Sequence, residues 1–557
     1  MPTWTTPRLP PLTSSLARRL ILSTACAVFV AQAPSSLAAS QVEASSQEAT
    51  YELGSIDVST ADIYPDNTSA LRRFINATHW TTRESVIRRE IWKRPGDTVD
   101  ERFAEELERN LRALGLFAEV TVDLVPSADS APGVRNLVVR TRDRLSISGG
   151  AGASFVGDAT SGSVSLSESN FLGLGDRLRF SVTENDFGET RGQLSYRDRY
   201  FLGSWTTATA TAGRAEEGDF YAVSFDRPFR YLEDDFAWNI TGGTTAIDQD
   251  YFFSNSTIAE VPIDIARLET SVRWRSGTRY SFTTRGLAAR YGDFDYSAAR
   301  GPSASTIDVP GDTQTLFAGG TLGITRLSTF REVTGLDTLR FVQDVQLGWT
   351  GSLEAGAVFR DEDGSEDSTQ PQVTARYSRI AAGGETRFLS TSLSGTVRTD
   401  DGEATGWRTD VGLRAFDLSL RPHTLALAVS YTEAEENENL PVQLTLGERN
   451  GLRGYPNREF TGQRFARINL EDRIDLDARL GTLDFGAVVF ADAAWIGDRG
   501  EDLEGPFTSA GVGLRIGSNP LFGRGVLRLD LSFPFDDANG ESFDPLLSFT
   551  LGQVFTL

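Results

Sequence analysis

Short runs of alternating hydrophobic and polar residues fill the chain from about residue 145 to residue 557, and clusters of Gly, Asp, Asn and Ser separate them. In VLRLDLSF (526–533), three leucines and Phe533 fall on one side, and Arg528, Asp530 and Ser532 fall on the other. Alternation with a period of two residues predicts β-strands. The region is therefore expected to be all-β.

Charged residues recur on the polar side of these runs. LDFGAVVFADAAW (483–495) sets its apolar residues against Asp492, and RINLEDR (467–473) sets its apolar residues against Glu471. A β-sandwich more often pairs its apolar face with neutral or exposed polar residues. Charges along one face of many strands favour a barrel with lipid outside and water inside.

The expected number of strands is about twenty. About fifteen precede the stretch NGLRGYPNREFTGQ (450–463), and five follow it. An even number of antiparallel strands places both termini of the barrel chain on the same side of the membrane. The fold is thus predicted to be mainly β, with an antiparallel transmembrane β-barrel over residues 145–557.

A different pattern occupies residues 51–144. A short helix is expected after Thr81 and Glu84, which have the spacing of a capping box. A second helix carries Phe103, Leu107, Leu111 and Leu114 on one stripe and ends at Gly115, after a turn at RPGD (94–97). Alternating strands are expected at 54–60, 120–125 and 136–141. The order β-α-α-β-β predicts one compact domain.

The first 38 residues are typical of a secretory signal peptide. Arg8, Arg18 and Arg19 precede the apolar run LILSTACAVFVA (20–31), and AQA (31–33) or SLA (36–38) supplies small residues for cleavage, after Ala33 or Ala38. Cys26, the one cysteine, is expected to leave with this peptide. Its loss removes three arginines and no acidic residue, so the net charge of −23 becomes −26.

Composition excludes several classes of function. The acidic charge argues against nucleic acid as a partner. His79 and His423 are the two histidines and fall in different regions, so neither a histidine-based catalytic site nor a metal site is expected. DEDGSED (361–367) lacks the spacing of a calcium loop and is interpreted as a solvated loop. No enzyme activity, metal or cofactor is predicted.

Two stretches before the barrel, and one near its start, resemble a known family. THWTTRESVIRREIWKRPGD (78–97), followed by EELERNLRALGLFAEVTVDL (105–124), resembles a POTRA domain. NFLGLGDRLRF (170–180) is similar to the first periplasmic hairpin of barrels in the BamA/TamA outer-membrane assembly superfamily, which includes the two-partner secretion transporters. The resemblance implies a location in the bacterial outer membrane, with the POTRA domain in the periplasm. It also implies a barrel of 16 strands rather than about twenty.

Two further motifs carry the resemblance into the barrel. GLRGY (451–455) resembles the superfamily's Arg-Gly-aromatic loop, which folds back into the lumen. FADAA (490–494) resembles its partner motif, with Ala494 in place of a glycine. The alternation points Glu471 and Asp492 into the lumen. Within the motif Leu452, Arg453, Gly454 and Tyr455, the guanidinium of Arg453 is therefore expected to bind both carboxylates and fix the loop inside the barrel.

The C-terminal stretch LSFTLGQVFTL (547–557) resembles the signal by which outer-membrane barrels are recognised for insertion. Gly552, Phe555 and Leu557 are the residues of this expected signal, and Leu557 replaces the usual final aromatic residue. The alternation places Leu547, Phe555 and Leu557 on one face of a last strand.

Three functions remain open. The leading hypothesis is a barrel, expected to be monomeric and in contact with outer-membrane lipids, that assists insertion, assembly or translocation of other proteins. Its POTRA domain would bind unfolded or extended client proteins through an exposed strand edge. The alternative is a two-partner secretion transporter, although the residues between position 38 and the first strand are too few for the second POTRA domain and plug helix of that group. A passive porin would need neither the POTRA domain nor the arginine loop.

Overall fold

The computed structural model describes residues 49–64, 68–77, 79–127, 133–156, 159–185, 189–340, 342–400, 402–437, 440–517, 525–537, 542 and 544–557. The predicted signal peptide, with Cys26 and both expected cleavage sites, lies outside the described residues. Among the described residues, no helix combines the length and the apolar character needed to cross a bilayer.

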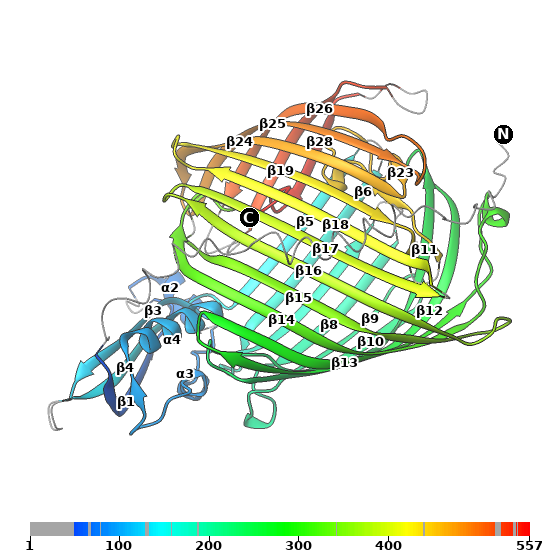
Figure 1. Ribbon diagram of the computed structural model, residues 1–557. Coiled ribbons are helices and arrows are strands. Elements are labelled where there is room, and N and C mark those ends of the chain that lie inside the picture. Colours follow the sequence, from blue (N-terminus) through cyan, green and yellow to red (C-terminus); the bar gives the residue numbers. More distant parts are fainter. Residues whose placement is uncertain are drawn as a thin grey trace. The chain divides into compact units, whose positions relative to one another are not determined.

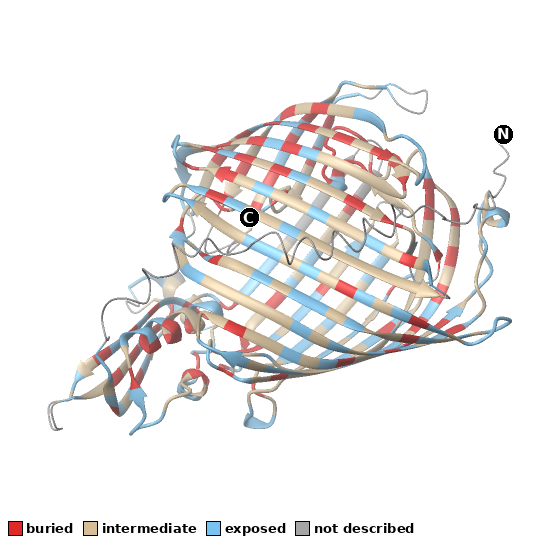
Figure 2. Cartoon of the chain, in the orientation of Figure 1, coloured by how far each residue is buried: buried red, intermediate tan, exposed pale blue. Residues whose placement is uncertain are grey.

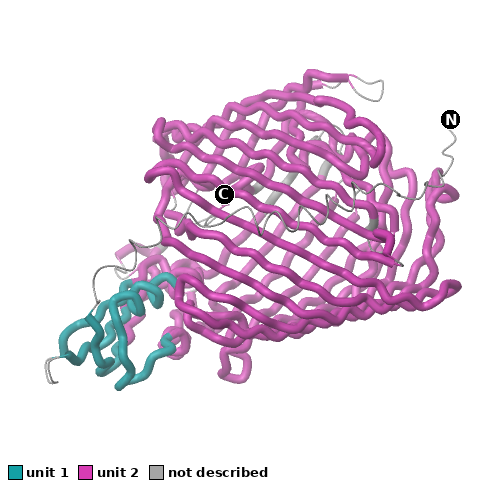
Figure 3. Tube along the Cα trace, in the orientation of Figure 1, with its two compact units in different colours: residues 1–57, 91–109, 121–139 teal, residues 58–90, 110–120, 140–557 magenta. Residues whose placement is uncertain are grey.

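The chain divides into two compact units (Figure 3). The first takes in residues up to 57 together with 91–109 and 121–139, and the second takes in 58–90, 110–120 and 140–557. This division passes through strands of the N-terminal region instead of following the expected boundary near residue 144. That domain boundary stays a prediction.

The N-terminal region contains a four-stranded sheet of order β2-β1-β4-β3. Its elements are β1 (Tyr51–Ala61), α2 (Ala70–Ala77), α3 (Glu84–Glu90), β2 (Thr98–Val99), α4 (Glu101–Ala113), β3 (Phe117–Pro126) and β4 (Val134–Asp143). The three predicted strands and both predicted helices are present. The predicted turn is present too, since the Asp97 amide donates to the Arg94 carbonyl at 3.0 Å.

The expected order β-α-α-β-β was incomplete, because α2 and β2 also form. The apolar residues Leu71, Phe74 and Ile75 of α2 have the spacing of a helical stripe, but the helix has only eight residues and Phe74 is exposed, so this short signal was missed. The strand β2 has only two residues, too few to show alternation. The helix α4 follows the prediction more closely, with Phe103, Leu107 and Leu111 all buried.

The second unit contains a closed antiparallel barrel, within which 20 strands are described (Figure 1). Its strands are β5 (Ile147–Val156), β6 (Ala159–Phe171), β7 (Asp176–Glu184), β8 (Thr190–Asp198), β9 (Thr207–Arg214), β10 (Asp219–Arg227), β11 (Phe236–Phe253), β12 (Ser256–Gly277), β13 (Ser281–Tyr296), β14 (Thr313–Val333), β15 (Gln343–Glu362), β16 (Ser368–Gly383), β17 (Arg387–Asp400), β18 (Glu403–Asp417), β19 (His423–Ala434), β24 (Arg464–Leu480), β25 (Leu483–Gly497), β26 (Glu504–Gly517), β27 (Val526–Pro534) and β28 (Leu546–Leu551).

The predicted strand number is confirmed, and the number of 16 implied by the family resemblance is wrong for this chain. Five barrel strands, β24 to β28, follow the GLRGY loop, as expected. We call the end where the chain enters β5 and leaves β28 the terminal end, and the opposite end the loop end.

The two faces of the barrel wall have opposite character, as the alternation predicted. Outward residues such as Leu470, Val489 and Leu531 are apolar and exposed, whereas Glu471 and Asp530 face inward and are buried. Figure 2 shows buried and exposed residues alternating along the strands. An apolar outer surface over a closed set of hydrogen-bonded strands is the arrangement by which a β-protein spans a membrane.

The chain between β19 and β24 folds into the loop end of the barrel. It contains the short hairpins β20 (Glu436–Asn437) with β21 (Leu440–Pro441) and β22 (Leu444–Leu446) with β23 (Phe460–Gly462), and the 3₁₀ turn η3 (Glu448–Asn450). Two further 3₁₀ turns, η1 (Phe201–Gly203) and η2 (Ala304–Thr306), lie between barrel strands.

The expectation of one continuous last strand through Leu557 was wrong. The strand β28 ends at Leu551, and Gly552 adopts a left-handed backbone (φ +106°), which turns the chain away from the wall. Phe555 is then buried in an apolar cluster with Leu336 and Phe416. Phe416 faces the lumen, because it pairs with Ala426, which in turn pairs with the inward Glu471.

Candidate functional site

The candidate site is the loop 447–459 inside the barrel, held at its base by the hairpin of β22 and β23. The amides of Glu448 and Leu452 donate to the carbonyls of Tyr455 and Gly447, each at 3.0 Å, and so close the loop on itself. Gly454 has φ +92°, a conformation that favours glycine. A side chain there would also come within 3.4 Å of Ser509 and Ser532 on the inner wall.

Arg453 lies between the two carboxylates that the sequence pointed into the lumen. Its Nε and Nη2 donate to Asp492 Oδ2 and Oδ1 at 2.7 and 2.8 Å, and its Nη1 donates to Glu471 Oε1 at 2.7 Å. All three side chains have no exposed surface. The planar guanidinium of Arg453 thus makes a bidentate, charge-assisted pair with the carboxylate of Asp492, which the ammonium group of a lysine could not make.

The surroundings keep Arg453 charged despite its burial. Burial works against the charged form, but Asp492, Glu471 and Asp530 outweigh it and raise the pKa of Arg453 above its ordinary value. The guanidinium also lies over the ring of Phe490, with its carbon 3.5 Å from the ring centre. Such a buried cation is stable only while its carboxylate partners stay in place.

The two apolar residues of the motif pack beside this ion pair. Leu452 and Tyr455 are fully buried in a cluster with Phe460 and Ala494. The Tyr455 hydroxyl donates to the Thr508 carbonyl at 2.9 Å. Ala494, which replaces the expected glycine, therefore contributes its methyl group to the packing under the loop.

Glu448 is a second buried acid of the loop, and the sequence pattern did not single it out. Ser548 Oγ donates to its Oε1 at 2.6 Å, and the Gly454 amide donates to its Oε2 at 3.0 Å. Burial raises the pKa of the Glu448 carboxyl above its ordinary value, against these hydrogen bonds. Glu448 thus joins the loop to β28, the last strand.

Arg473 connects the loop site with the C-terminal residues, and sequence reasoning gave it no such role. Its Nε donates to Glu471 Oε2 at 2.7 Å, its Nη2 to the Phe555 carbonyl at 2.8 Å, and its Nη1 to the Leu336 carbonyl at 2.9 Å. Arg453, Glu471, Arg473 and Phe555 therefore form one continuous chain of contacts. The alternation of charged residues along β24 could have predicted that Arg473 faces the lumen. No sequence signal could have identified the main-chain carbonyls that it binds.

The predicted C-terminal residues lie at the terminal end of the lumen. The Gly552 amide donates to the Val526 carbonyl at 2.7 Å, and the Leu557 amide donates to Asp337 Oδ1 at 3.0 Å. Phe555 and Leu557 pack against the same apolar cluster. These residues are thus together, but on the inside of the barrel.

Neither histidine lies in this site. His79 Nε2 lies 2.8 Å from Asp143 Oδ2, and His423 Nδ1 lies 2.9 Å from Asp472 Oδ2. Within the described part of the chain, no group of three or more His, Cys, Asp or Glu residues is arranged to hold a metal ion.

Comparisons with known proteins give one relative by sequence and several by structure. No family model matches the chain. A putative outer membrane protein assembly factor of Treponema pallidum (strain Nichols) is 28% identical over 130 residues, which cover 22% of this chain and 15% of that protein. The matched stretch is thus a small part of the relative.

The similar solved structures include BamA of Haemophilus ducreyi, lacking POTRA domains 1–3, with 12% identity, a TM-score of 0.41, and coverage of 89% of this chain and 84% of the other. They also include CdiB of Acinetobacter baumannii (11%, TM-score 0.43, 90% and 74%) and CdiB of Escherichia coli (12%, TM-score 0.44, 90% and 76%).

Proposed function

We propose that this protein is an outer-membrane barrel that assists the insertion, assembly or translocation of other proteins. The observation that carries the proposal is the fully buried contact of Arg453 with Asp492 and Glu471, which fixes a long loop inside the lumen. A passive porin needs an open channel, and a loop built into its interior by buried charges works against that need. In a barrel that inserts or translocates other proteins, an ordered loop in the lumen can contact the polypeptide chain of the client protein.

The N-terminal sheet offers a place for client proteins to bind. The ten-residue strand β3 stands at one edge of the sheet, with Val120, Val122 and Leu124 buried and the residues between them exposed. An extended segment of a client adds to such an edge through main-chain hydrogen bonds. The protein would act as a monomer, with lipid around the barrel and this sheet in the periplasm.

Depletion of the protein in its host, followed by quantitative proteomics of outer-membrane and secreted fractions, tests the proposal. We expect a set of outer-membrane barrel proteins to fall in abundance, and rescue by the wild-type chain but not by Arg453→Ala. Loss of one secreted protein alone would favour the two-partner secretion alternative. Unchanged fractions would overturn the proposal.

A further inference from the structure

The inner wall at the terminal end of β7 and β8 carries arginines that form no ion pair with an acidic residue in the described part of the chain. Phe180 and Leu194 are exposed on the outer face, so the alternate residues Arg177, Arg179 and Arg197 face the lumen. The strand register sets Arg177 directly opposite Arg197. Like charges in opposite positions destabilise a sheet, so this pair costs free energy in the empty barrel.

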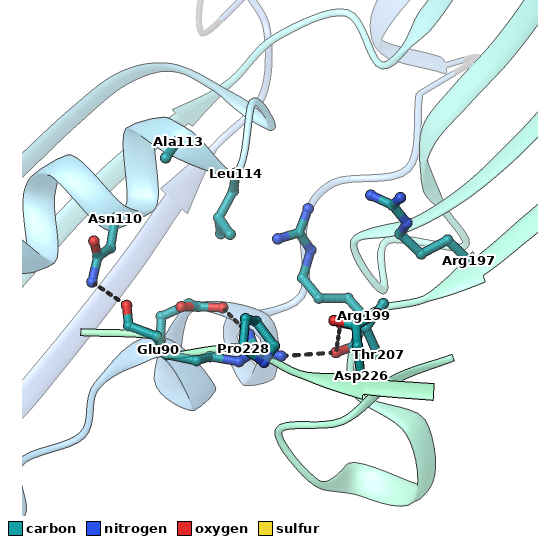
Figure 4. A pocket seen from close by; sticks show the side chains of 10 residues that line it. Glu90, Asn110, Ala113, Leu114, Arg197, Arg199, Thr207, Asp226 and Pro228 are labelled. Carbon is teal, nitrogen blue, oxygen red and sulfur yellow. Dashed lines mark hydrogen bonds and ion pairs between the residues drawn. The ribbon is translucent and has the colours of Figure 1, made fainter. Parts of the chain in front are cut away.

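A cavity of about 320 Å³ opens beside these arginines (Figure 4). Arg197, Arg199 and Arg230 line it together with Glu90 and Asp226, and all its lining residues belong to the second compact unit. In Figure 4 the guanidinium groups of Arg197 and Arg199 point the same way.

The cations of this cavity differ in what they already bind. Arg230 is engaged, because its Nη1 donates to Glu90 Oε1 at 3.2 Å and its Nη2 to the Trp205 carbonyl at 2.9 Å. Glu90 also accepts the Tyr200 hydroxyl, and its negative charge is paired with the positive charge of Arg230. Of the nearby acids, Asp226 attracts Arg197 and Arg230, and Asp176 attracts Arg199, but neither acid forms an ion pair with Arg197 or Arg199 among the described residues.

Arg199 has a buried donor without a partner. Its Nε is among the buried polar atoms of the described residues that make no hydrogen bond. A buried N–H group left unpaired costs free energy, so native proteins seldom keep one without a reason. An unpaired buried Nε of Arg199 beside the like-charged pair of Arg177 and Arg197 indicates that an anion belongs in this cavity.

We propose that Arg197 and Arg199, together with Arg177 and Arg179 on the neighbouring strand β7, bind the carboxylates of an acidic polypeptide segment at the terminal end of the lumen. This inference rests on the proposed function, since a client segment supplies the ligand. The inner face of the wall favours a polypeptide over a lipid headgroup, because lipid contacts the outer face. The planar fork of each arginine fits a carboxylate of Asp or Glu.

The test uses the purified full-length protein in detergent micelles and a fluorescein-labelled peptide of ten glutamates, with a ten-glutamine peptide as the neutral probe. Fluorescence anisotropy should show binding of the acidic peptide alone, weakening as salt is raised. Arg197→Gln with Arg199→Gln should weaken this binding at least about tenfold, as expected from losing charge-assisted hydrogen bonds. Arg197→Lys with Arg199→Lys should retain part of it.

Arg214→Gln with Arg479→Gln is the matched control, because it removes two arginines whose side chains are 85% and 57% exposed in other parts of the barrel. This control should bind the acidic peptide like the wild type. Removing Arg197 relieves the repulsion with Arg177, so the glutamine pair should unfold at no lower temperature, which separates lost binding from lost folding.

Equal binding of the acidic peptide by the wild type and the Arg197/Arg199 glutamine pair would overturn the inference. So would displacement of the peptide by phosphatidylglycerol micelles but not by unlabelled peptide, which would indicate a lipid site. A protein that assembles clients in the depletion experiment, yet shows either result, would leave the proposed function standing and remove this inference alone.

Discussion

Replacing Arg453 with alanine should release the lumen loop while leaving the barrel inserted. The substitution removes three short hydrogen bonds to Asp492 and Glu471. Glu471 keeps Arg473 at 2.7 Å, whereas Asp492 keeps the Asn469 side-chain amide, also at 2.7 Å, and a longer-range attraction to Arg467 with no direct ion pair. The stranded charge of Asp492 therefore accounts for most of the expected cost.

The burial of these groups decides the magnitude. A partly wet lumen would reduce the cost of breaking the pair to about 1–3 kcal/mol. Arg453, Asp492 and Glu471 have no exposed side-chain surface, so the full cost of breaking a buried pair, about 3–5 kcal/mol, is the better expectation. At about 1.4 kcal/mol per factor of ten, the open form of the loop should be populated roughly a hundred to a few thousand times more.

Thiol labelling measures this population. Leu452 is fully buried beside Arg453, so Leu452→Cys in a Cys26→Ser background gives a thiol that reacts only when the loop opens. We expect Arg453→Ala to accelerate labelling by the factor above, and Arg453→Lys to accelerate it less. Adding Asp492→Ala to Arg453→Ala removes the stranded charge, so the double variant should label more slowly than the two single effects combined predict. Simple additivity of the two effects would refute the coupling on which this reasoning depends.

Three further outcomes are expected. Unheated samples should migrate differently from boiled samples on a denaturing gel and should fractionate with the outer membrane, and recovery in a soluble fraction would contradict the barrel account. Arg473→Ala should expose the C-terminal residues around Phe555 to carboxypeptidase, since it removes a 2.8 Å bond to the Phe555 carbonyl, and unchanged digestion would contradict that role. The pKa of Glu448 is raised in the folded loop, so its protonated form stabilises the loop fully below the unfolded pKa of about 4.3, and this stabilisation is lost as pH rises through the raised pKa. Labelling of the Leu452→Cys variant should therefore increase with pH over that window. It should stay flat with pH when Glu448→Gln is added.

Alternation was enough to predict the barrel because each strand has one face toward lipid and one toward the lumen. The charged inward positions 471 and 492 followed from the same rule, since a shift of one residue would place them in lipid. The strand number followed from counting alternating runs, and it held where the family resemblance implied fewer strands. The alternation along the strands thus predicted which residues face lipid and which face the lumen.

The remainder depended on contacts that have no local pattern. Phe555 fits the alternation of a last strand, but a left-handed backbone at Gly552 takes it into the lumen. The partners of Arg473 are main-chain carbonyls, which every residue possesses and no sequence motif marks. The helix α2 has only eight residues, so the helical spacing of its few large apolar residues is too short a pattern to predict it from sequence alone. Such features follow from tertiary packing, which a single sequence does not display.

Reconstitution of the purified protein into liposomes tests the proposed function most directly. Urea-unfolded outer-membrane barrel proteins are added, and their insertion is followed by protection from protease and by heat-modifiable migration. We predict faster insertion into liposomes with the wild-type protein than into empty liposomes, and a slower rate with Arg453→Ala although that variant is fully inserted itself. Equal rates in all three, together with a large and steady conductance of the wild-type protein in planar bilayers, would contradict the proposal and favour a passive channel.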